Sequence, residues 1–197
     1  RKVWQIEQPL PMQVHRWHGA RIVRLTLPPR SWSRHHDVSV EAFCRRWFAA
    51  ERFDLVHAHC IQELGIGPLT VARDLGIPYV VTLHDGWWLS PRQFLTTPSG
   101  RPVDVRDPLG HMEVMAAFDA EEQQQARQRR TELEQVLAGA AVRLAVSQAF
   151  AAVHEQAGIK DVSVMENRWQ PMPAAGPRSQ RPADQPLRCC FIGGMAI

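Results

Sequence analysis

Apolar residues in this chain gather into short runs that alternate with stretches of helical periodicity. The run at 77–83 is continuous and rich in β-branched residues, which is typical of a strand buried in a parallel sheet. The segment 37–52 repeats apolar residues on one helical face and starts at Asp37, a residue suited to an N-cap. Similar patterns predict strands at 2–6, 20–27, 54–59, 142–146, 162–165 and 187–192, and helices over part of 61–75, at 112–138 and at 148–156.

Strands that alternate with helices predict an α/β fold with a doubly wound, parallel, Rossmann-like sheet. We expect this domain to span residues 1–169. Residues 170–186 carry five prolines and few large apolar side chains, a composition typical of a linker. The apolar run that follows predicts residues 187–197 to be the first strand of a second domain that the chain does not contain. Because residue 1 is an arginine, we also expect the natural protein to begin upstream.

The composition narrows the class of protein. Lys and Arg number 23 against 20 Asp and Glu, and the formal charge of +3 fits an anionic ligand without requiring nucleic acid. No run is long enough for a spanning helix and no signal-peptide pattern opens the chain. We therefore expect a cytoplasmic protein, with a peripheral contact at the inner face of the membrane left open. The four cysteines (Cys44, Cys60, Cys189 and Cys190) lack metal-site spacing and are interpreted as reduced, small apolar fillers.

Two long segments need a separate interpretation. Residues 86–110 are irregular and rich in Pro, Gly and Thr, and their length favours a functional loop or lid. The predicted helix 112–138 is polar nearly all round between 119 and 132, which is typical of a helix that projects into solvent. Arg127, Arg129 and Arg130 form a basic patch there, which we interpret as a solvated face; contact with a membrane surface is the alternative.

Four consecutive predicted strands end on polar side chains or on a glycine. Ligands of open α/β sheets bind at the carboxyl ends of the strands, so these residues are expected to share one edge. They are His59 after the first strand, His84, Asp85 and Gly86 after the second, Ser147 after the third and Asn167 after the fourth.

His84 is the strongest candidate for chemistry, because an imidazole can position a hydroxyl or stabilise a changing charge. Asp85 either orients this ring or caps a following helix. Trp87 and Trp88 either line a sugar or apolar acceptor site or pack beneath the loop, and we expect packing for at least one of them.

The other candidates fit structural roles as well. For His59 a structural and a functional role are equally compatible with the pattern. His57 lies on the same face of that strand, and there a structural role is favoured. Ser147 fits an N-cap, although a helix N-terminus at the sheet edge also suits an anion. Asn167 either lines the site or occupies a left-handed turn.

Five segments together resemble a known family. They read FDLVHAHC at 53–60, IPYVVTLHDGWWLSPR at 77–92, RLAVSQAF at 143–150, VSVMEN at 162–167 and FIGG at 191–194. In order and spacing they resemble the N-terminal, acceptor-side domain of the group 1, family 4-like, retaining glycosyltransferases, which have the two-domain GT-B fold. The resemblance covers about residue 53 to the end, and the His-Asp-x-Trp stretch is its most specific part.

The resemblance implies transfer of a sugar from a nucleotide-sugar donor to a glycan, lipid-linked or other acceptor, with retained anomeric configuration. It implies no metal and no cofactor, since the nucleotide-sugar is a substrate. His84 corresponds to the histidine near the transferred sugar. Asp85 and Trp87, with Gly86 between them, go with the acceptor cleft, and Ser147 and Asn167 with the interdomain side. By analogy the pathway is polysaccharide or lipopolysaccharide biosynthesis.

Three departures from the family pattern matter. Nothing before residue 2 supplies the family's opening strand and Gly-Gly loop, and Asn167 is followed by Arg168 where the family has glycine. The chain also ends before the glutamate pair that holds the donor, so we expect it to be inactive alone. Two alternatives stay open: a metal-dependent hydrolase built on His57, His59 and His84, and a non-catalytic glycan-binding or scaffold module.

Overall fold

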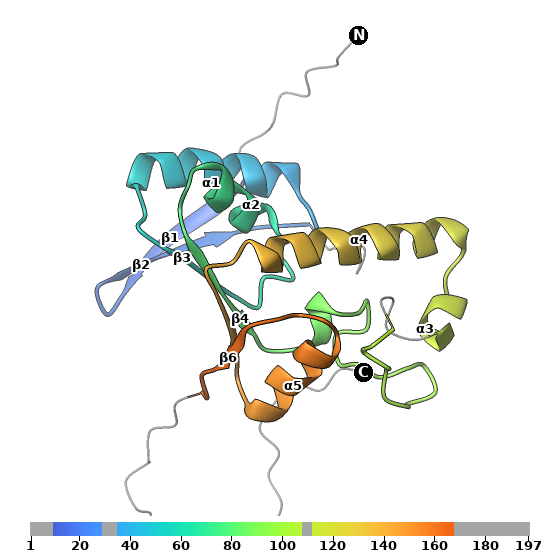
Figure 1. Cartoon of the computed structure of the whole chain (residues 1–197). Coiled ribbons are helices and arrows are strands. Elements are labelled where there is room, and N and C mark those ends of the chain that lie inside the picture. The colour runs from blue at the N-terminus through green and yellow to red at the C-terminus, as the bar shows by residue number, and fades with distance from the viewer. Residues whose placement is uncertain (1–9, 29–34, 108–111, 168–197) are drawn as a thin grey trace, which may run out of the picture. The chain divides into compact units, whose positions relative to one another are not determined.

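The computed structural model describes residues 10–28, 35–107 and 112–167, and it divides into two units, 1–166 and 167–197. The first unit holds a four-stranded sheet in the order β3-β4-β5-β6 and a separate two-stranded sheet (Figure 1). The predictions at 2–6, 170–186 and 187–192, with Cys189 and Cys190, lie outside the described residues.

The four-stranded sheet is parallel throughout, which confirms the predicted α/β class. Each strand pairs with the next one along the chain, and helical segments connect each pair. The strands are β3 (Val56–His59), β4 (Tyr79–Leu83), β5 (Val142–Ala145) and β6 (Val162–Val164). The connecting helices are α2 (Gly67–Asp74) after β3, η1 (Gly86–Trp88), α3 (Met112–Ala116) and α4 (Ala120–Ala138) after β4, and α5 (Gln148–Gln156) after β5.

The strand predicted at 20–27 does not belong to this sheet. It is β2 (Ala20–Leu25), which pairs antiparallel with β1 (Met12–Trp17), a strand that the pattern did not predict. The two residues between them, His18 and Gly19, both have positive φ angles, 46° and 83°. A two-residue turn of this kind matches the right-handed twist of the flanking strands and closes a tight hairpin.

Helix α1 (Val38–Glu51) follows the prediction closely. The Asp37 side chain accepts hydrogen bonds from the backbone amides of Ser39 and Val40, as an N-cap does. The helix buries Cys44 among other apolar side chains, and burial raises the pKa of its thiol to about 12. Cys60, by contrast, is exposed and has a φ angle of 45°, so its interpretation as an apolar filler was wrong.

The helix predicted at 112–138 is broken into two. Asp119 accepts from the backbone amide of Glu122, and Glu122 accepts from that of Asp119, so the pair forms a capping box that starts α4. The expected solvated basic face was also wrong in part. Arg127 is exposed, but Arg129 and Arg130 are only 1% and 6% exposed. None of the described helices combines the length and apolarity needed to span a bilayer.

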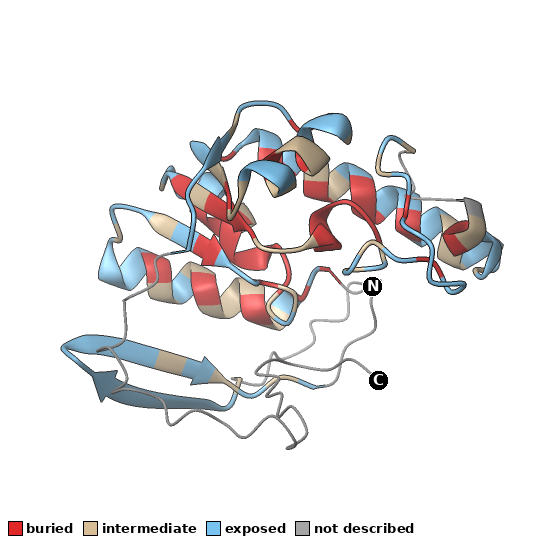
Figure 2. Cartoon of the chain, turned by 90° about the horizontal axis from the view of Figure 1, so that it is seen from below, coloured by how far each residue is buried: buried red, intermediate tan, exposed pale blue. Residues whose placement is uncertain are grey.

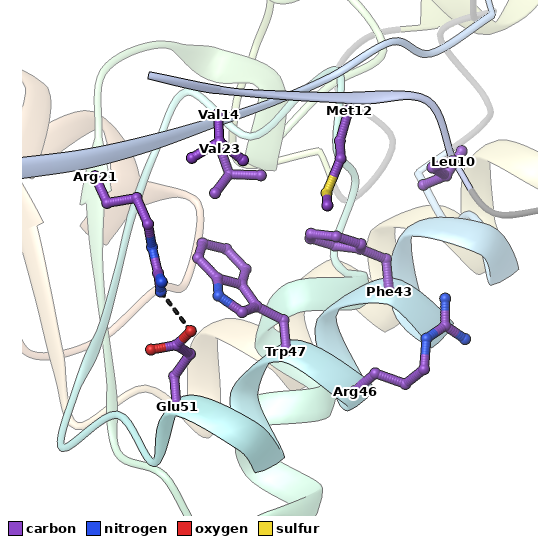
Figure 3. Close-up of a pocket in the computed structure, with 9 residues that line it drawn as sticks. All are labelled: Leu10, Met12, Val14, Arg21, Val23, Phe43, Arg46, Trp47 and Glu51. Carbon is purple, nitrogen blue, oxygen red and sulfur yellow. Dashed lines mark ion pairs between the residues drawn. The ribbon is translucent and has the colours of Figure 1, made fainter. Parts of the chain in front are cut away.

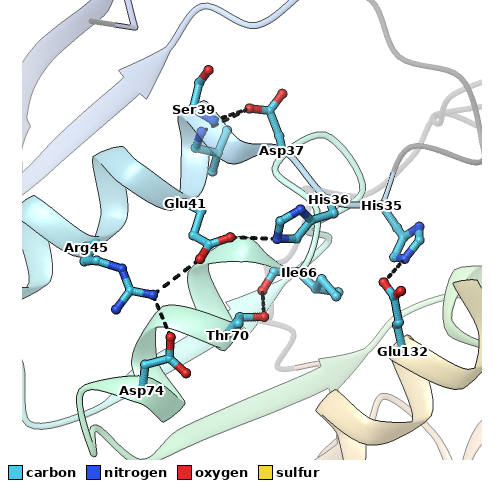
Figure 4. Close-up of polar contacts among 11 residues, drawn as sticks. His35, His36, Asp37, Ser39, Glu41, Arg45, Ile66, Thr70, Asp74 and Glu132 are labelled. Atoms are coloured by element: carbon cyan, nitrogen blue, oxygen red, sulfur yellow. Dashed lines mark hydrogen bonds and ion pairs between the residues drawn. The ribbon is translucent and has the colours of Figure 1, made fainter. Parts of the chain in front are cut away.

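Polar contacts join α1 to α2 and α4 (Figure 4). Just before α1, His35 Nε2 lies 2.6 Å from Glu132 Oε2 on α4, while the carbonyl of His35 accepts from the amide of Ile66 at the start of α2. Arg45 on α1 donates to Asp74 on α2 at 2.6 Å. Buried residues concentrate where these helices meet the parallel sheet, whereas the hairpin is largely exposed (Figure 2).

Tyr79 fixes the end of α4 against the central strand β4. Its hydroxyl donates to the carbonyl of Val136 at 2.7 Å, in the last turn of α4, where backbone carbonyls lack helical partners. Gly139 caps this helix, and a Cβ added to it would lie 2.5 Å from the Tyr79 hydroxyl oxygen. Glycine is therefore required at 139 by the close approach of that hydroxyl.

This contact predicts a non-additive pair of substitutions. Tyr79→Phe should lower the free energy of unfolding by about 1–3 kcal/mol, because a buried carbonyl loses its donor. Gly139→Ala should cost a similar ~1–3 kcal/mol by overpacking in the parent. In the Tyr79→Phe background, however, the clashing oxygen is gone, and Gly139→Ala should cost close to nothing. Urea denaturation of the four proteins measures the coupling; strict additivity would contradict this account of Gly139.

Candidate functional site

The carboxyl ends of the parallel strands carry most of the predicted site residues. His59 ends β3, His84 follows β4 and Ser147 follows β5. The register pairs His59 with Thr82 and Leu83 with Ala145, so the three positions succeed one another along one edge of the sheet. The structure therefore confirms the parallel arrangement from which this shared edge was predicted.

Two of these residues touch directly. His59 Nδ1 and His84 Nε2 lie 2.9 Å apart, a hydrogen bond in which one ring donates and the other accepts. The ring of His57 lies beside that of His59, with centroids 4.1 Å apart, which confirms that both project to one face of β3. His57 in turn contacts the Thr82 hydroxyl at 2.8 Å, the structural role that its position favoured.

The surroundings of His59 make it harder to protonate than a free imidazole. Burial lowers the pKa of His59 from its ordinary value, and the neighbouring rings of His57 and His84 lower it further because two adjacent imidazolium ions repel each other. Within the described residues no hydrogen bond involves the second nitrogen of His84, Nδ1. A half-buried imidazole with one nitrogen fixed and the other open is suited to bind a hydroxyl or a carbonyl.

Asp85 organises the turn after β4 by accepting hydrogen bonds at both of its carboxylate oxygens. Its Oδ1 accepts from the amide of Trp87 at 3.0 Å and so caps the short helix η1. Its Oδ2 accepts from the side-chain amides of Gln62 and Gln93, both at 2.6 Å. Of the two roles left open for Asp85, the capping role is the one that the hydrogen bonds show.

Gly86 allows the following loop to fold back onto this turn. Its amide donates to the carbonyl of Gln93 at 2.8 Å, and a Cβ added to it would lie 2.4 Å from side-chain atoms of Leu95. The loop predicted over 86–110 is thus tied to its own beginning. Further along, Arg101 and Glu113 form an ion pair at 2.7 Å between the loop and α3.

Two arginines of α4 bind the backbone of the turn that follows β4. The guanidinium of Arg129 stacks on the Trp87 ring at 4.7 Å and donates to the Trp87 carbonyl at 2.6 Å. Arg130 donates to the carbonyl of Leu89 at 2.7 Å and pairs with Glu134 at 2.6 Å. Burial lowers the pKa of Arg129 to about 10, and the charge of Arg130 adds to the shift while Asp85 opposes it.

The two tryptophans that follow Gly86 are part of this packing. Trp87 and Trp88 are only 7% and 4% exposed, and their rings meet edge to face. Both pack beneath the turn, as we expected for at least one of them. The contribution of Trp87 to an acceptor cleft stays a prediction, and a direct contact with a ligand would require its ring to leave the core.

The remaining predicted residues are less tightly grouped. Ser147 caps α5, since its hydroxyl accepts from the amide of Phe150 at 3.2 Å. Asn167 is exposed and belongs to the C-terminal unit, so its place relative to the sheet edge stays a prediction. A cavity of about 240 Å³ lies beside His57 and His59 and is otherwise lined mainly by apolar side chains of β2, α1, β3 and α2.

The described part of the chain offers no set of ligands for the metal-dependent hydrolase considered as an alternative. No group of three or more His, Cys, Asp and Glu residues there is arranged to hold a metal ion. In the triad considered for a hydrolase, His59 and His84 point ring nitrogens at each other, and His57 points one at Thr82. Those nitrogens are already engaged with protein partners.

Sequence reasoning missed Arg129 and Arg130 as parts of the site's support. The signal lay in their spacing, because both fall on the stripe of α4 that is buried. That stripe comprises Ala126, Arg129, Arg130, Leu133, Val136 and Leu137. Residues three and four apart on a helix share a face, so the apolar members placed the arginines in the interior. Gln62 and Gln93 gave no comparable signal, since their roles arise only when two loops meet Asp85.

The buried His154 on α5 predicts a pH dependence of stability. Its Nδ1 donates to the Phe150 carbonyl at 3.0 Å, and its Nε2 has no hydrogen-bond partner among the described residues. Burial lowers its pKa from the ordinary 6.5. Below that pH the unfolded chain binds a proton that the folded chain refuses, so the free energy of unfolding should fall as the pH falls.

His154→Gln should therefore weaken this acid dependence, because it removes the titrating group. Urea midpoints of the parent and the variant, followed from neutral pH down to about pH 5, measure the difference in slope. His15→Gln, which removes an exposed histidine of β1, is the matched control and should leave the slope unchanged. Equal slopes for the parent and His154→Gln would contradict the assignment.

Comparison with known proteins gives one clear result. The family model described as Glycosyltransferase Family 4 matches residues 6–167. The curated proteins and the solved structures gave no significant match. The match covers most of the chain, including both sheets and the whole edge with His59, His84 and Ser147. The chain therefore belongs to glycosyltransferase family 4, and it covers the N-terminal GT-B domain region of that family.

Proposed function

We propose that this domain forms the acceptor-side wall of a retaining, nucleotide-sugar-dependent glycosyltransferase, with His84 as the residue that contacts the transferred sugar. The observation that carries the proposal is the His59–His84 pair at the carboxyl edge of a parallel sheet. Family membership supports the reaction class, and the edge is where ligands of open α/β sheets bind. The donor would be held mainly by a second domain facing this edge.

The geometry supports a role for His84 as a hydrogen-bond donor and for His59 as the residue that orients it. With one nitrogen of His84 engaged by His59, its Nδ1 is left to hydrogen-bond a sugar hydroxyl or an acceptor group. When His59 donates, His84 accepts at Nε2 and carries its own proton at Nδ1, which makes Nδ1 a donor. Glycosyl transfer develops positive charge at the anomeric carbon, so a neutral donor is better placed there than an imidazolium ion.

The neighbouring residues fix the backbone turn that carries His84. Asp85 caps the turn, Gly86 lets the loop close over it, and Trp87 anchors it to Arg129. Their contribution to the acceptor cleft is therefore to keep His84 in place. Ser147, at the N-terminus of α5, and Asn167 stay proposed for the interdomain side, where a helix N-terminus suits donor phosphates.

His84→Ala should remove most of the transfer activity and leave the fold intact. The ring lies at the end of β4 and is only half-buried, so its loss should not disturb the core. Removal of one group that acts in the transition state typically costs about 10²-fold or more in rate. The assay measures nucleoside diphosphate release by the complete protein with a panel of nucleotide-sugars. His36→Ala, which removes a surface partner of Glu41, is the control. A His84→Ala protein that turns over near the parent rate would contradict the role proposed for His84.

His59 is expected to act through His84. His59→Asn removes the ring that fixes Nε2 of His84, so kcat should fall by roughly 10-fold while KM changes little. A purely structural role would instead lower stability without this separation of kcat from KM.

The purified protein and the nucleotide-sugar panel also test the two alternative functions. A stoichiometric zinc, manganese or iron content in the purified protein would favour the hydrolase interpretation of the histidines. Failure of every nucleotide-sugar in the panel, combined with measurable glycan binding, would favour a non-catalytic module. Release of nucleoside diphosphate that requires an acceptor supports the transferase and also identifies the donor.

A further inference from the structure

The backbone ladder between β3 and β4 ends before it reaches the paired rings of His59 and His84. Its last pairing joins His59 to Thr82, two residues before His84. On its other side β4 stays paired as far as Leu83, which lies opposite Ala145 of β5. The sheet therefore fixes the point at which His59 leaves β3, but the ladder alone does not fix how the two rings meet.

Free volume lies beside the His59 ring on the side of α1. The cavity of about 240 Å³ that reaches His57 and His59 is otherwise lined mainly by apolar side chains. This cavity shares Val23, Phe43 and Trp47 with a larger one of about 450 Å³, across which these side chains of β2 and α1 face one another (Figure 3). Apolar side chains offer an imidazole no hydrogen bond, so the ring depends on polar contacts on the side of β4.

The loop after β3 bends as soon as it leaves His59. Cys60 has a φ angle of 45°, in the left-handed region that residues other than glycine seldom adopt. Such a strained conformation persists only where contacts of the surrounding structure enforce it. The bend therefore depends on what the next residues of the loop bind.

Gln62, two residues further along, makes such a contact. Its side-chain amide donates to Asp85 Oδ2 at 2.6 Å, and Asp85 directly follows His84. A short hydrogen bond to a carboxylate is stronger than one between neutral groups. Within the described residues, the loop after β3 and the turn after β4 are thus joined at two points, ring to ring at 2.9 Å and Gln62 to Asp85.

Gln93 binds the same oxygen but connects different elements. Its side-chain amide donates to Asp85 Oδ2 at 2.6 Å, and its carbonyl accepts from the amide of Gly86. Gln93 lies in the loop after β4, and among the described residues these bonds return to that same loop. Gln62, in contrast, ties the end of β3 to the end of β4. The two glutamines therefore form a matched pair for experiment.

We propose that Gln62 is a positioning residue for the histidine pair: by binding Asp85, it fixes the loop that carries His59 against the turn that carries His84. The consequence for catalysis rests on the role proposed above for His84. Gln62 acts through the two rings, and it sets the direction in which Nδ1 of His84 points. Loss of the link should therefore lower kcat, because a reacting group is displaced, and leave substrate binding little changed.

NMR spectra of the complete protein labelled with ¹⁵N-histidine test this link without any substrate. At about pH 8, above the range in which imidazoles usually take up a proton, the scalar coupling between His59 Nδ1 and His84 Nε2 reports their hydrogen bond. Gln62→Met keeps the length of the side chain and removes its donor, so the coupling should be lost. Gln93→Met removes a bond to the same oxygen and should retain the coupling.

Kinetics of the complete protein test the consequence for the reaction. Gln62→Met should lower kcat roughly 10-fold with little change in KM, as expected for His59→Asn. The two substitutions together should cost little more than either alone, because both act on the same ring. Glu63→Met, at an exposed position in the same loop, is the control and should leave both parameters unchanged. Urea denaturation separates these effects from a general loss of stability.

The outcomes separate this proposal from the proposed function. A parent without the coupling, a coupling that survives in Gln62→Met, or an equal loss in Gln93→Met would overturn the positioning role. So would a Gln62→Met protein that turns over at the parent rate while His84→Ala is inactive. If His84→Ala itself keeps the parent rate, the transfer role of His84 fails instead, and the spectra decide whether Gln62 holds the pair.

Discussion

The parallel pairing of β3, β4, β5 and β6 is the constraint on which the rest of this domain depends. Parallel strands all end at the same edge, and each connecting helix returns the chain to the opposite edge to start the next strand. Side chains far apart in sequence are therefore delivered to one line, with His59 and His84 close enough to share a hydrogen bond. A single antiparallel strand in this set would have sent one of the rings to the far end of the sheet.

The turn after β4 shows how much structure supports one imidazole. Asp85 organises it by accepting three hydrogen bonds, and Arg129 and Arg130 bind its carbonyls from α4. Buried cations are costly unless their donors are satisfied, and here the backbone and an aromatic face supply most of that compensation. The charge of Asp85 adds to it, as its effect on the pKa of Arg129 indicates. The support is polar, dense and specific to one backbone conformation.

Much of this could be predicted from the sequence, and the failures have physical reasons. The continuous apolar run at 77–83 and the polar residues at strand ends indicated the sheet and its edge, because burial and strand direction leave a direct trace in the pattern. The break at Asp119 was missed although Glu122 completes a capping box, since helical periodicity on both sides masked the local signal. Arg129 was assigned to solvent because its charge outweighed its position on the buried stripe. The hydrogen bonds of Gln62 and Gln93 could not be predicted, because they depend on how two loops meet.

The separation of the two sheets has a consequence for how this domain can change over time. The hairpin forms its own hydrogen-bonded ladder and shares none with the parallel sheet. Substitutions along β1 and β2 therefore do not shift the hydrogen-bond register that aligns the two rings. The outward-facing positions of the hairpin can therefore diversify without disturbing the strand alignment that brings His59 and His84 together.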